Sequence, residues 1–561
     1  MDVKYLLSGI CVAFVLLGVF AGVSLSVALA SARTIYVPDS YTKIQLAIDN
    51  AKAGDIIVVR DGWYFENIKV NKSLTIKSEN GSANCRVRAD NPNDHAIEVK
   101  SDHVNISGFS VRGTTGWKSC GIYLINVNYC GISNNNCSHT WSGHGIFLNT
   151  SFNNTISNNT CSYNDYLGIC LRYSSDNLIS GNDCKNNEWG GISISHSNNN
   201  SVLSNQCDEI AITYSQNNNI TNNDCISGGI YLADDSNKNI ISSNDCSNSE
   251  TNGIWVLRSE NNTITNNDCD NCDWDGISIQ DSNNNNVSGN ECINNNNGIT
   301  LKNSNNNIIS RNNCKNNNLF NGMYIKNSSD NTIYLNNLID NTNNVYPPAS
   351  TNIWNSTEKI TYTYKGKTYT NCLGNYWSDY KEKYPDAEEI DGTGIGDTPY
   401  SINSDNDNYP LIMPFENYFL TTENIFDTGT PSNPYPSIAG THTGTIIPNR
   451  TITMNKLYTY SCEGTGGHTE YARIYNDSWS IETLPWEGYG GDWRNLSFAE
   501  PFKLCAEEEY KFTLITGSYP QIIHKQNHTT LDGSLITCTK FTDANGRVYY
   551  DWIPAIRLWS R

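Results

Sequence analysis

Two stretches decide the fold: GISISHSNNNSVLSNQC (Gly191–Cys207) and GISIQDSNNNNVSGNEC (Gly276–Cys292). In each, apolar residues follow the Gly by one and three places, which is the alternation of a β-strand. A further apolar residue, Val202 or Val287, stands five places after the Ser, and a Cys closes the set. One such unit carries only about four inward side chains, too few to bury a core unless similar units stack on it.

The same pattern recurs along the chain as a Ser slot followed ten positions later by a Cys slot. An Asn stands three residues after every Ser slot, from Asn154 to Asn331, and another stands eight after, from Asn159 to Asn336. A period of 18 to 24 residues is typical of solenoids. Identical spacing requires parallel pairing, and the crossover rule makes the winding right-handed. The sequence therefore predicts a right-handed parallel β-helix of about 11 coils. The nine slot pairs are Ser151/Cys161, Ser174/Cys184, Ser197/Cys207, Ser215/Cys225, Ser236/Cys246, Ser259/Cys269, Ser282/Cys292, Ser304/Cys314 and Ser328/Leu338.

The Asn and Cys slots have separate roles. Asn tolerates the left-handed conformation of a tight bend, and its amide can hydrogen-bond the coils above and below, so we expect the Asn slots at the corners. The nine Cys residues from Cys137 to Cys314 are predicted to form a buried ladder, because their spacing differs from that of zinc-binding C-x-x-C patterns. Copper bound along this ladder is the alternative. Cys462, Cys505 and Cys538 lie elsewhere, and their odd number leaves one disulfide open.

The rest of the chain divides by composition. Residues 6–30 are almost wholly apolar and precede Ala30-Ser31-Ala32, which is typical of a signal-peptidase site. The apolar run is also long enough for an uncleaved anchor. Beyond a stretch rich in Pro, Gly, Ser and Thr, alternating strands predict a β-sandwich. The predicted parts are a signal peptide or membrane anchor (1–32), a β-helix with an N-terminal cap (33–345), a closing module (346–420), a linker (421–440) and the β-sandwich (441–561).

The net charge of −20 and the pI of about 4.8 exclude some partners. Such a chain is poorly suited to nucleic acid or to an anionic membrane surface, so membrane contact is expected only if residues 1–32 stay attached. Asn-x-Ser/Thr sequons at Asn449, Asn476, Asn495 and Asn527 are consistent with a glycoprotein that is secreted or held at the cell surface.

The distance from a Cys slot to the next Gly slot varies. It is two residues after Cys207 and four after Cys225, against six to eight elsewhere. These two short turns predict a notch in one edge of the solenoid, and aromatic residues crowd the same edge. Stacked rings suit the apolar faces of sugars, although they would equally cover the core. The predicted carbohydrate-binding residues are Trp141, Tyr166, Trp189, Tyr231, Trp255 and Trp274.

Catalysis at the notch is an open alternative to binding. A glycosidase needs two carboxylates that face each other across the scissile bond. The acids nearest the short turns are Glu188, Asp208, Glu209 and Asp275, and Glu209 occupies a Gly slot. The sequence identifies no catalytic set among them, so a polysaccharide hydrolase or lyase remains the second hypothesis.

The segment EIDGTGIGD (Glu389–Asp397) resembles acidic, Gly-rich calcium loops. Oxygen ligands at alternate positions and glycines at sharp bends are what Ca²⁺ requires. Glu389, Asp391 and Asp397 keep ligand positions, whereas Thr393 replaces an acid. Calcium is the one cofactor that the sequence predicts, with a plain Asp/Gly turn as the alternative.

The N-terminal segment, the Asn/Cys coils and the stretch GNYWSDYKEKYPDAEEIDGTGIGDTPYSINSDNDNYPLIMPFENY (Gly374–Tyr418) resemble the NosD-like, or CASH-domain, β-helix family. They are most similar to the version found in surface proteins of methanogenic archaea, and the resemblance covers residues 34–418. It implies an exported β-helix protein that binds carbohydrate, a glycan or envelope polysaccharide, or serves as an envelope scaffold without catalysis. The family name comes from a protein linked to copper-site assembly. The four Met and nine His are scattered here, so a copper-related accessory role is the lesser alternative.

Overall fold

The structure is a computed structural model. It describes residues 32–560 apart from 347–349, 366, 420–424, 431–437, 463–465, 487, 489–493, 518–519 and 531–532. The apolar run predicted as signal peptide or anchor falls outside the described residues. Within the described part, none of the helices combines the length and the apolarity that crossing a membrane requires.

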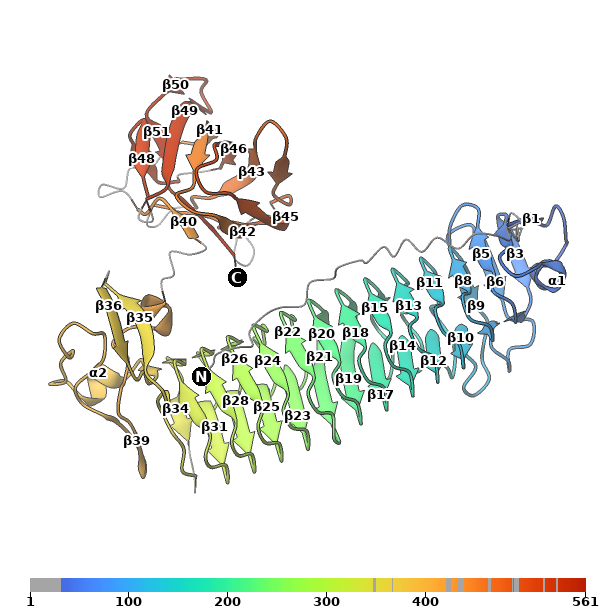
Figure 1. Ribbon diagram of the computed structural model, residues 1–561, viewed down its shortest axis with the longest axis horizontal. Coiled ribbons are helices and arrows are strands. Elements are labelled where there is room, and N and C mark those ends of the chain that lie inside the picture. Colours follow the sequence, from blue (N-terminus) through green and yellow to red (C-terminus); the bar gives the residue numbers. More distant parts are fainter. Residues whose placement is uncertain are drawn as a thin grey trace, which may run out of the picture. The chain divides into compact units, whose positions relative to one another are not determined.

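The coils form a parallel β-helix, as predicted (Figure 1). The chain divides into two compact units, residues 1–263 and 264–561, and each is described by itself. Sheet A of the first unit contains, in order, β1 (Thr34–Val37), β2 (Ile56–Val59), β5 (Thr75–Ser78), β8 (Asn105–Ser107), β11 (Gly131–Ser133), β13 (Thr155–Ser157), β15 (Leu178–Ser180), β18 (Ser201–Leu203), β20 (Asn219–Thr221) and β22 (Ile240–Ser242). Sheet B contains β4 (Ile68–Val70), β7 (Ile97–Val99), β10 (Ile122–Ile125), β12 (Ile146–Asn149), β14 (Ile169–Arg172), β17 (Ile192–Ser195), β19 (Gln206–Thr213), β21 (Asp224–Ala233) and β23 (Ile254–Leu257).

A third face of the first unit begins with β3 (Gly62–Phe65), β6 (Cys85–Arg88) and β9 (Ser110–Arg112). The second unit repeats the three faces. Its sheet A strands are β26 (Asn286–Ser288), β29 (Ile308–Ser310) and β32 (Thr332–Tyr334). Its sheet B strands are β25 (Asp275–Gln280), β28 (Asn297–Lys302), β31 (Asn321–Lys326) and β34 (Asn343–Tyr346), and its third face contains β27 (Glu291–Ile293), β30 (Asn313–Lys315), β33 (Asn337–Ile339) and β37 (Tyr376–Trp377).

The coil number was underestimated from the sequence. One sheet A strand for each coil, including β24 (Thr263–Thr265), gives 14 coils along the chain, against the predicted 11 or so. The missed coils lie in residues 34–78, where β1 pairs with β2 and β2 with β5 in parallel. These coils lack the Asn and Cys slots, so the period does not reveal them. The predicted cap is α1 (Ile44–Asn50), which buries Ile44, Ala47 and Ile48.

The inward side chains stack in register, which confirms the predicted core. On sheet B, Ile192 pairs with Ile210 and Ile210 with Ile230. The Cys slots from Cys137 to Cys314 are fully buried within their units, and the Sγ atoms of Cys207 and Cys225 lie 3.8 Å apart. No disulfide joins cysteines within the described residues, so the disulfide left open among Cys462, Cys505 and Cys538 does not form.

The Asn slots are hydrogen-bonded between coils, as expected, but they are not the left-handed residues. Asn182 donates its backbone N–H and its amide to Oδ1 of Asn205, at 2.9 and 3.0 Å. The positive φ falls one residue earlier, at Asn153, Asp176, Asn199 and Asn217. The reason is geometric: the residue before the slot turns the chain, so that the slot itself can point its amide inward over the neighbouring coil.

Residues 350–419 close the solenoid of the second unit. The antiparallel hairpin of β35 (Ile360–Tyr364) and β36 (Lys367–Asn371) packs Tyr362 and Tyr364 with Leu373, Ile395 and Tyr418 in one apolar cluster. Two short elements, α2 (Tyr380–Lys383) and the 3-10 helix η1 (Phe415–Tyr418), and the hairpin of β38 (Tyr400–Ile402) and β39 (Asp405–Asp407) complete this module.

The C-terminal part is an antiparallel β-sandwich, as predicted. One sheet orders β40 (Ile425–Asp427), β52 (Ile556–Trp559), β42 (Ile452–Thr459) and β45 (Asn495–Leu504). The other contains β44 (Ser480–Glu482), β43 (Thr469–Tyr475), β46 (Tyr510–Thr516), β41 (Gly440–Ile447), β49 (Leu535–Asp543) and β48 (Asn527–Thr529). Phe426, Phe502 and Phe512 from both sheets share one core. Because β40 is a sandwich strand, the linker predicted at 421–440 was drawn too long.

Candidate functional site

Outward side chains of sheet B form a row in register across the first unit. They alternate with the buried Ile and Leu residues, so each points away from the core. It begins with Lys69 and Glu98, and from β10 to β23 it is aromatic at both ends and small in the middle: Tyr123, Phe147, Cys170, Ser193, Ala211, Tyr231 and Trp255. The outer surface therefore falls from ring-sized side chains to small ones for three consecutive coils, and then rises again at Tyr231.

Tyr231 and Trp255 form the aromatic pair at one end of this row. Their ring centroids are 5.0 Å apart with an interplanar angle of 47°. Both rings are half-buried, so part of each ring face is open to solvent. The backbone register of β21 and β23 fixes the spacing of the two rings, which gives a preorganised apolar surface.

The two coils predicted to be short have strand in place of a turn. The strands β19 and β21 each run straight from the Cys slot into sheet B, with a register shift between Cys207 and Glu209. In the coil before them, residues 185–191 leave the sheet as a turn. Glu209 lies where that turn would have been, between Gly190 and Gly228. A Cβ atom at residue 228 would be 2.7 Å from Cβ of Glu209.

The predicted turn aromatics do not form one continuous surface. Tyr166 and Trp189 form a second pair, with centroids 5.0 Å apart, and Trp189 is 67% exposed. Trp141 lines a separate pocket, described below. Trp274 is exposed in the second unit. Of the six predicted residues, the structure thus brings four together as two pairs.

Glu209 is one of two candidate acids, with Asp275, whose carboxyl pKa is raised by burial. Its burial, followed by the nearby charge of Asp208, raises the pKa of its carboxyl to about 7. Burial is also the main reason for the raised pKa of the Tyr231 hydroxyl, to which the charge of Glu209 adds. The acid and the aromatic pair are therefore within electrostatic reach of each other.

The other three acids have different surroundings. Both oxygens of Asp208 accept backbone N–H groups, from Asn186 at 2.9 Å and from Asn187 at 2.8 Å, so this carboxylate holds the neighbouring turn. Glu188 is exposed. Asp275, at the start of β25 in the second unit, accepts the Asn297 amide at 2.8 Å, and burial raises its pKa.

The acidic loop predicted to bind calcium is stabilised by hydrogen bonds and one ion pair. Glu389 accepts the backbone N–H of Gly394 at 2.9 Å and pairs with Lys365 at 3.2 Å. Oδ1 of Asp397 accepts the backbone N–H of Glu388 and the hydroxyl of Thr398, both at 2.9 Å. Asp391 is exposed with a φ of 42°. In the described part of the chain, no group of three or more His, Cys, Asp or Glu side chains is arranged to hold a metal ion, and calcium stays a prediction.

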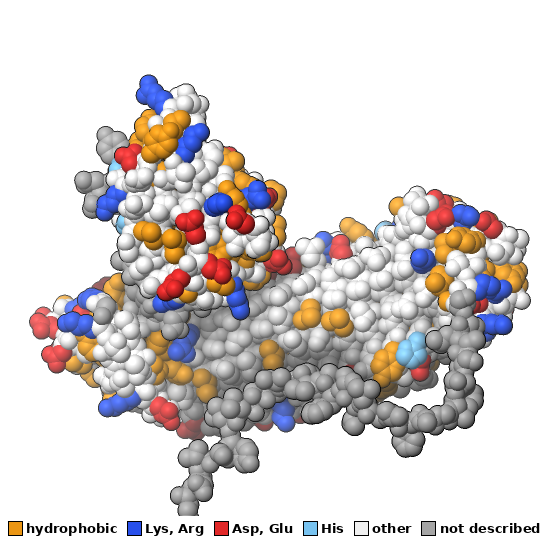
Figure 2. All heavy atoms as spheres, turned by 45° about the horizontal axis from the view of Figure 1, so that its top comes forward, with side chains coloured by type: hydrophobic (Ala, Val, Ile, Leu, Met, Phe, Trp, Pro, Cys, Tyr) orange, Lys and Arg blue, Asp and Glu red, His pale blue; other side chains and the backbone are white. Residues whose placement is uncertain are grey.

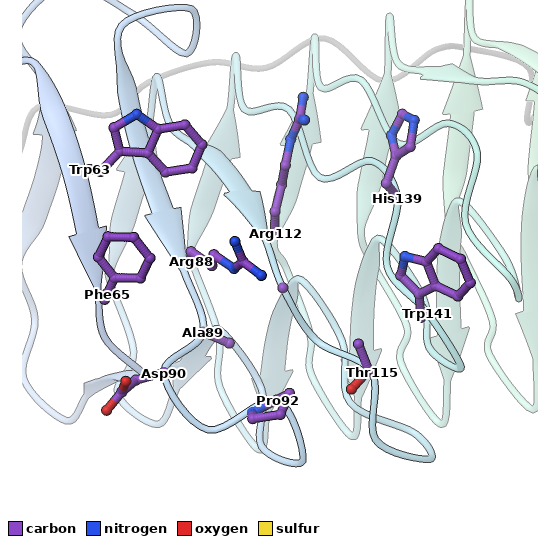
Figure 3. Close-up of a pocket in the computed structure, with 11 residues that line it drawn as sticks. Trp63, Phe65, Arg88, Ala89, Asp90, Pro92, Arg112, Thr115, His139 and Trp141 are labelled. Atoms are coloured by element: carbon purple, nitrogen blue, oxygen red, sulfur yellow. The ribbon is translucent and has the colours of Figure 1, made fainter.

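A pocket that sequence reasoning missed opens on the third face of the first unit (Figure 3). It has a volume of about 680 Å³. The lining side chains include Trp63 and Phe65 on β3, Arg88 on β6, Arg112 on β9, and Trp141 on the loop between β11 and β12. The only sequence signal for it is the outward set of two short strands, WYFE (63–66) and CRVR (85–88), which lie before the Asn repeats.

Two family models match the solenoid. The model described as "Right handed beta helix region" matches residues 95–227, and that described as "Periplasmic copper-binding protein (NosD)" matches residues 203–382. A cell surface glycoprotein of Methanothermus fervidus is 43% identical over 108 residues, which is 19% of this chain. The match spans only 17% of the length of that relative.

Solved structures with a similar fold share little sequence. The A-module of a mannuronan C-5 epimerase from Azotobacter vinelandii has a TM-score of 0.37 and 14% identity, over 55% of this chain and 94% of that one. The Dettilon tailspike protein has a TM-score of 0.40 and 14% identity, over 87% of this chain and 94% of that one. Neither likeness bears on activity.

Proposed function

We propose that this chain, a right-handed β-helix protein of the NosD-like family, binds glycans at the cell surface without catalysis. The surface location is supported by the name of the archaeal relative and by the periplasmic description of the NosD family. It agrees with the apolar N-terminal run of the sequence.

The aromatic pair Tyr231 and Trp255, beside three small outward side chains, carries the proposal. A sugar ring that stacks on Trp255 and Tyr231 would place its apolar C–H face on the rings and its rim over Ala211 and Ser193. The coil surface seen in Figure 2 is mostly white, meaning uncharged polar side chains and backbone. Such a surface suits a neutral glycan, whose hydroxyls exchange hydrogen bonds with water and with amides.

Hydrolysis is the second candidate, and Glu209 is the observation that favours it. A carboxylic acid with a pKa of about 7 has the protonation range that a general acid needs. Glycoside hydrolysis also requires a second carboxylate across the bond. Asp208, its closest predicted partner, is engaged by two backbone N–H groups, which supports binding without turnover as the first candidate.

Copper carriage is the least supported function. The donors that repeat along the chain are the thiols of the Cys ladder, which are buried. The pKa of Cys207 lies well above its usual value, first because of its hydrogen bond with Cys225 and then because of burial, so the thiol form is favoured over the metal-binding thiolate. Metal analysis of the purified protein would test this role.

The experiment is a glycan array followed by titration calorimetry with the best neutral ligand. Trp255→Ala and Tyr231→Ala are each expected to weaken binding about tenfold to a hundredfold, because each removes a ring face from the contact. Trp117→Ala is the matched control, since Trp117 is 73% exposed and its ring lies under the Lys118 ammonium, 3.8 Å from Nζ to the centroid. Unchanged affinity in both variants would exclude the aromatic pair as the binding site. Release of sugar products that is lost in Glu209→Gln would establish the hydrolase instead.

A further inference from the structure

The pocket on the third face is built from three coils in register. Phe65 pairs with Arg88, and Arg88 with Arg112, so one aromatic and two guanidinium groups follow one another across β3, β6 and β9. Adjacent strands are about 4.8 Å apart. Figure 3 shows Trp63 and Phe65 on one side of the two arginines, and His139 and Trp141 on the other.

The aromatic walls are open to solvent. Trp63 and Phe65 are each 54% exposed, and their rings are nearly parallel, with centroids 6.3 Å apart. Trp141, on the opposite wall, is 62% exposed. The guanidinium of Arg86 lies 5.1 Å from the centroid of the Trp63 ring, which fixes the ring and adds positive charge behind it.

The two central arginines differ from three of the seven arginines of the first unit in having no ion-pair partner among the described residues. Arg33, Arg60 and Arg258 each have a carboxylate within 4 Å. The guanidinium groups of Arg88 and Arg112 are exposed, and within the described residues neither has an ion-pair partner. In a chain with a net charge of −20, two adjacent unpaired arginines between aromatic rings form a local anion site.

Gly113 keeps this site open. Its φ of 92° lies in the left-handed region, and a Cβ atom there would be 2.7 Å from Cγ of Arg88. A side chain at residue 113 would therefore displace the Arg88 side chain, which lies against the backbone of Gly113. The glycine allows the Arg88 side chain to lie flat in the pocket.

From this geometry we infer that the pocket binds an acidic saccharide, with its carboxylate or sulfate groups on Arg88 and Arg112 and its ring faces on Trp63, Phe65 and Trp141. Guanidinium groups bind both anions through paired N–H donors, and aromatic faces accept sugar C–H groups. The three strand spacings from β3 to the coil of Trp141 span roughly 14 Å, which is the scale of a short oligosaccharide. The site is separate from Tyr231 and Trp255, so its failure would leave the proposed neutral-glycan site standing.

A nucleic acid also offers anions and stacking rings, but the chain favours it less. Nucleic-acid binding relies on many Lys and Arg contacts along a phosphate backbone. The pocket offers two free guanidinium groups, and Asp90 stands on its rim. A short acidic oligosaccharide presents one or two anionic groups beside apolar ring faces, which matches the two guanidinium groups of the pocket.

The test is titration calorimetry on the full chain with four ligands: oligogalacturonate, its carboxyl-reduced neutral form, a heparin-derived hexasaccharide and a single-stranded oligonucleotide. Binding is expected for at least one acidic sugar. The two acidic arms show whether the preferred group is carboxylate or sulfate. Arg88→Gln and Arg112→Gln should each weaken that binding about tenfold to a hundredfold, and Trp63→Ala should weaken it as well.

Arg172→Gln is the matched control. Arg172 is exposed on sheet B of the same unit, and its guanidinium lies over Tyr173, 5.4 Å from the ring centroid. It should bind the acidic sugar as the unmodified protein does, and all variants should keep the same thermal midpoint because the changed side chains are exposed. The inference is overturned if neither acidic sugar binds. It is equally overturned if the neutral form or the oligonucleotide binds as tightly as the acidic sugar, or if the arginine variants bind the acidic sugar with unchanged affinity.

Discussion

Asn205→Ala removes one rung of the Asn ladder and should destabilise the first unit strongly. The amide of Asn205 donates to the carbonyl oxygens of Ile179 (3.0 Å) and Leu203 (3.1 Å) and to Oδ1 of Asn223 (3.0 Å). Its Oδ1 accepts the backbone N–H and the amide of Asn182, at 2.9 and 3.0 Å. All of these groups lie inside the solenoid, where water cannot replace the lost partner.

The expected loss of unfolding free energy is about 3–5 kcal/mol. The buried N–H of Asn182 would lose its acceptor, which costs about 1–3 kcal/mol, and the remaining bonds contribute about 0.5–1.5 kcal/mol each. Asn198→Ala is the control in the same coil. Asn198 is exposed, and its Oδ1 accepts only the N–H of Gln216 at 2.7 Å, so that variant should lose less than about 1 kcal/mol.

The assay is urea unfolding followed by circular dichroism, with hydrogen exchange measured on peptides from the coils on either side of residue 205. Nearest-neighbour coupling in a solenoid predicts that protection falls first in those coils. Asn205→Asp adds a further comparison, because it keeps the shape and the acceptor while replacing the donor by a buried charge, and should cost at least as much as alanine. Equal midpoints for Asn205→Ala and Asn198→Ala would refute the inference that the ladder stabilises the coils.

Three other outcomes are expected. Burial raises the pKa of Glu209 in the folded protein from 4.5 to about 7, so its contribution to stability falls as the pH rises from about 4.5 to about 7 and changes no further above that. The free energy of unfolding of Glu209→Gln should therefore exceed that of the unmodified protein by about 2–3 kcal/mol at pH 8 and by little at pH 4, as measured in paired denaturant titrations. An equal difference at both pH values would exclude this linkage. A thiol reagent should label the exposed Cys505 quickly under native conditions and Cys207 only after unfolding, as read by peptide mass spectrometry. Rapid labelling of Cys207 would contradict a buried ladder. Calcium should raise the unfolding midpoint of the unmodified protein but not of Asp397→Asn, and equal midpoints in calcium and in chelator would reject the calcium loop.

The fold could be predicted because its determinants repeat in the sequence. The inward Ile and Cys positions keep fixed spacing from the Ser slot, and each buried Asn returns after the same number of residues. The first coils escaped because Ile35, Ile57 and Ile76 pair in sheet A without any Asn slot to mark them. The positions of the residues with positive φ were also not predicted. The type of a side chain indicates which residues tolerate the left-handed conformation, but not which of two neighbouring residues adopts it.

The two proposed binding surfaces could be predicted only in part. Tyr231 and Trp255 were found because both coils carry the Gly slot, which aligns them by counting. Phe65, Arg88 and Arg112 were missed because their coils have no Asn or Gly slots, so nothing in the sequence shows that residues 23 and 24 positions apart share one column. Register there comes from strand pairing, which is a property of the folded chain.

Inward residues fix the register of the coils and outward residues do not, which is how one solenoid can hold both proposed binding surfaces. Register is fixed by inward amides and aliphatic side chains, so an outward residue can be replaced with little effect on its coil. The Trp63 and Trp255 strands are separated by about eight coils, roughly 38 Å at the strand spacing of sheets. Sites that far apart and without shared partners act independently. Acidic sugar on Arg88 and neutral glycan on Trp255 should therefore bind without competing.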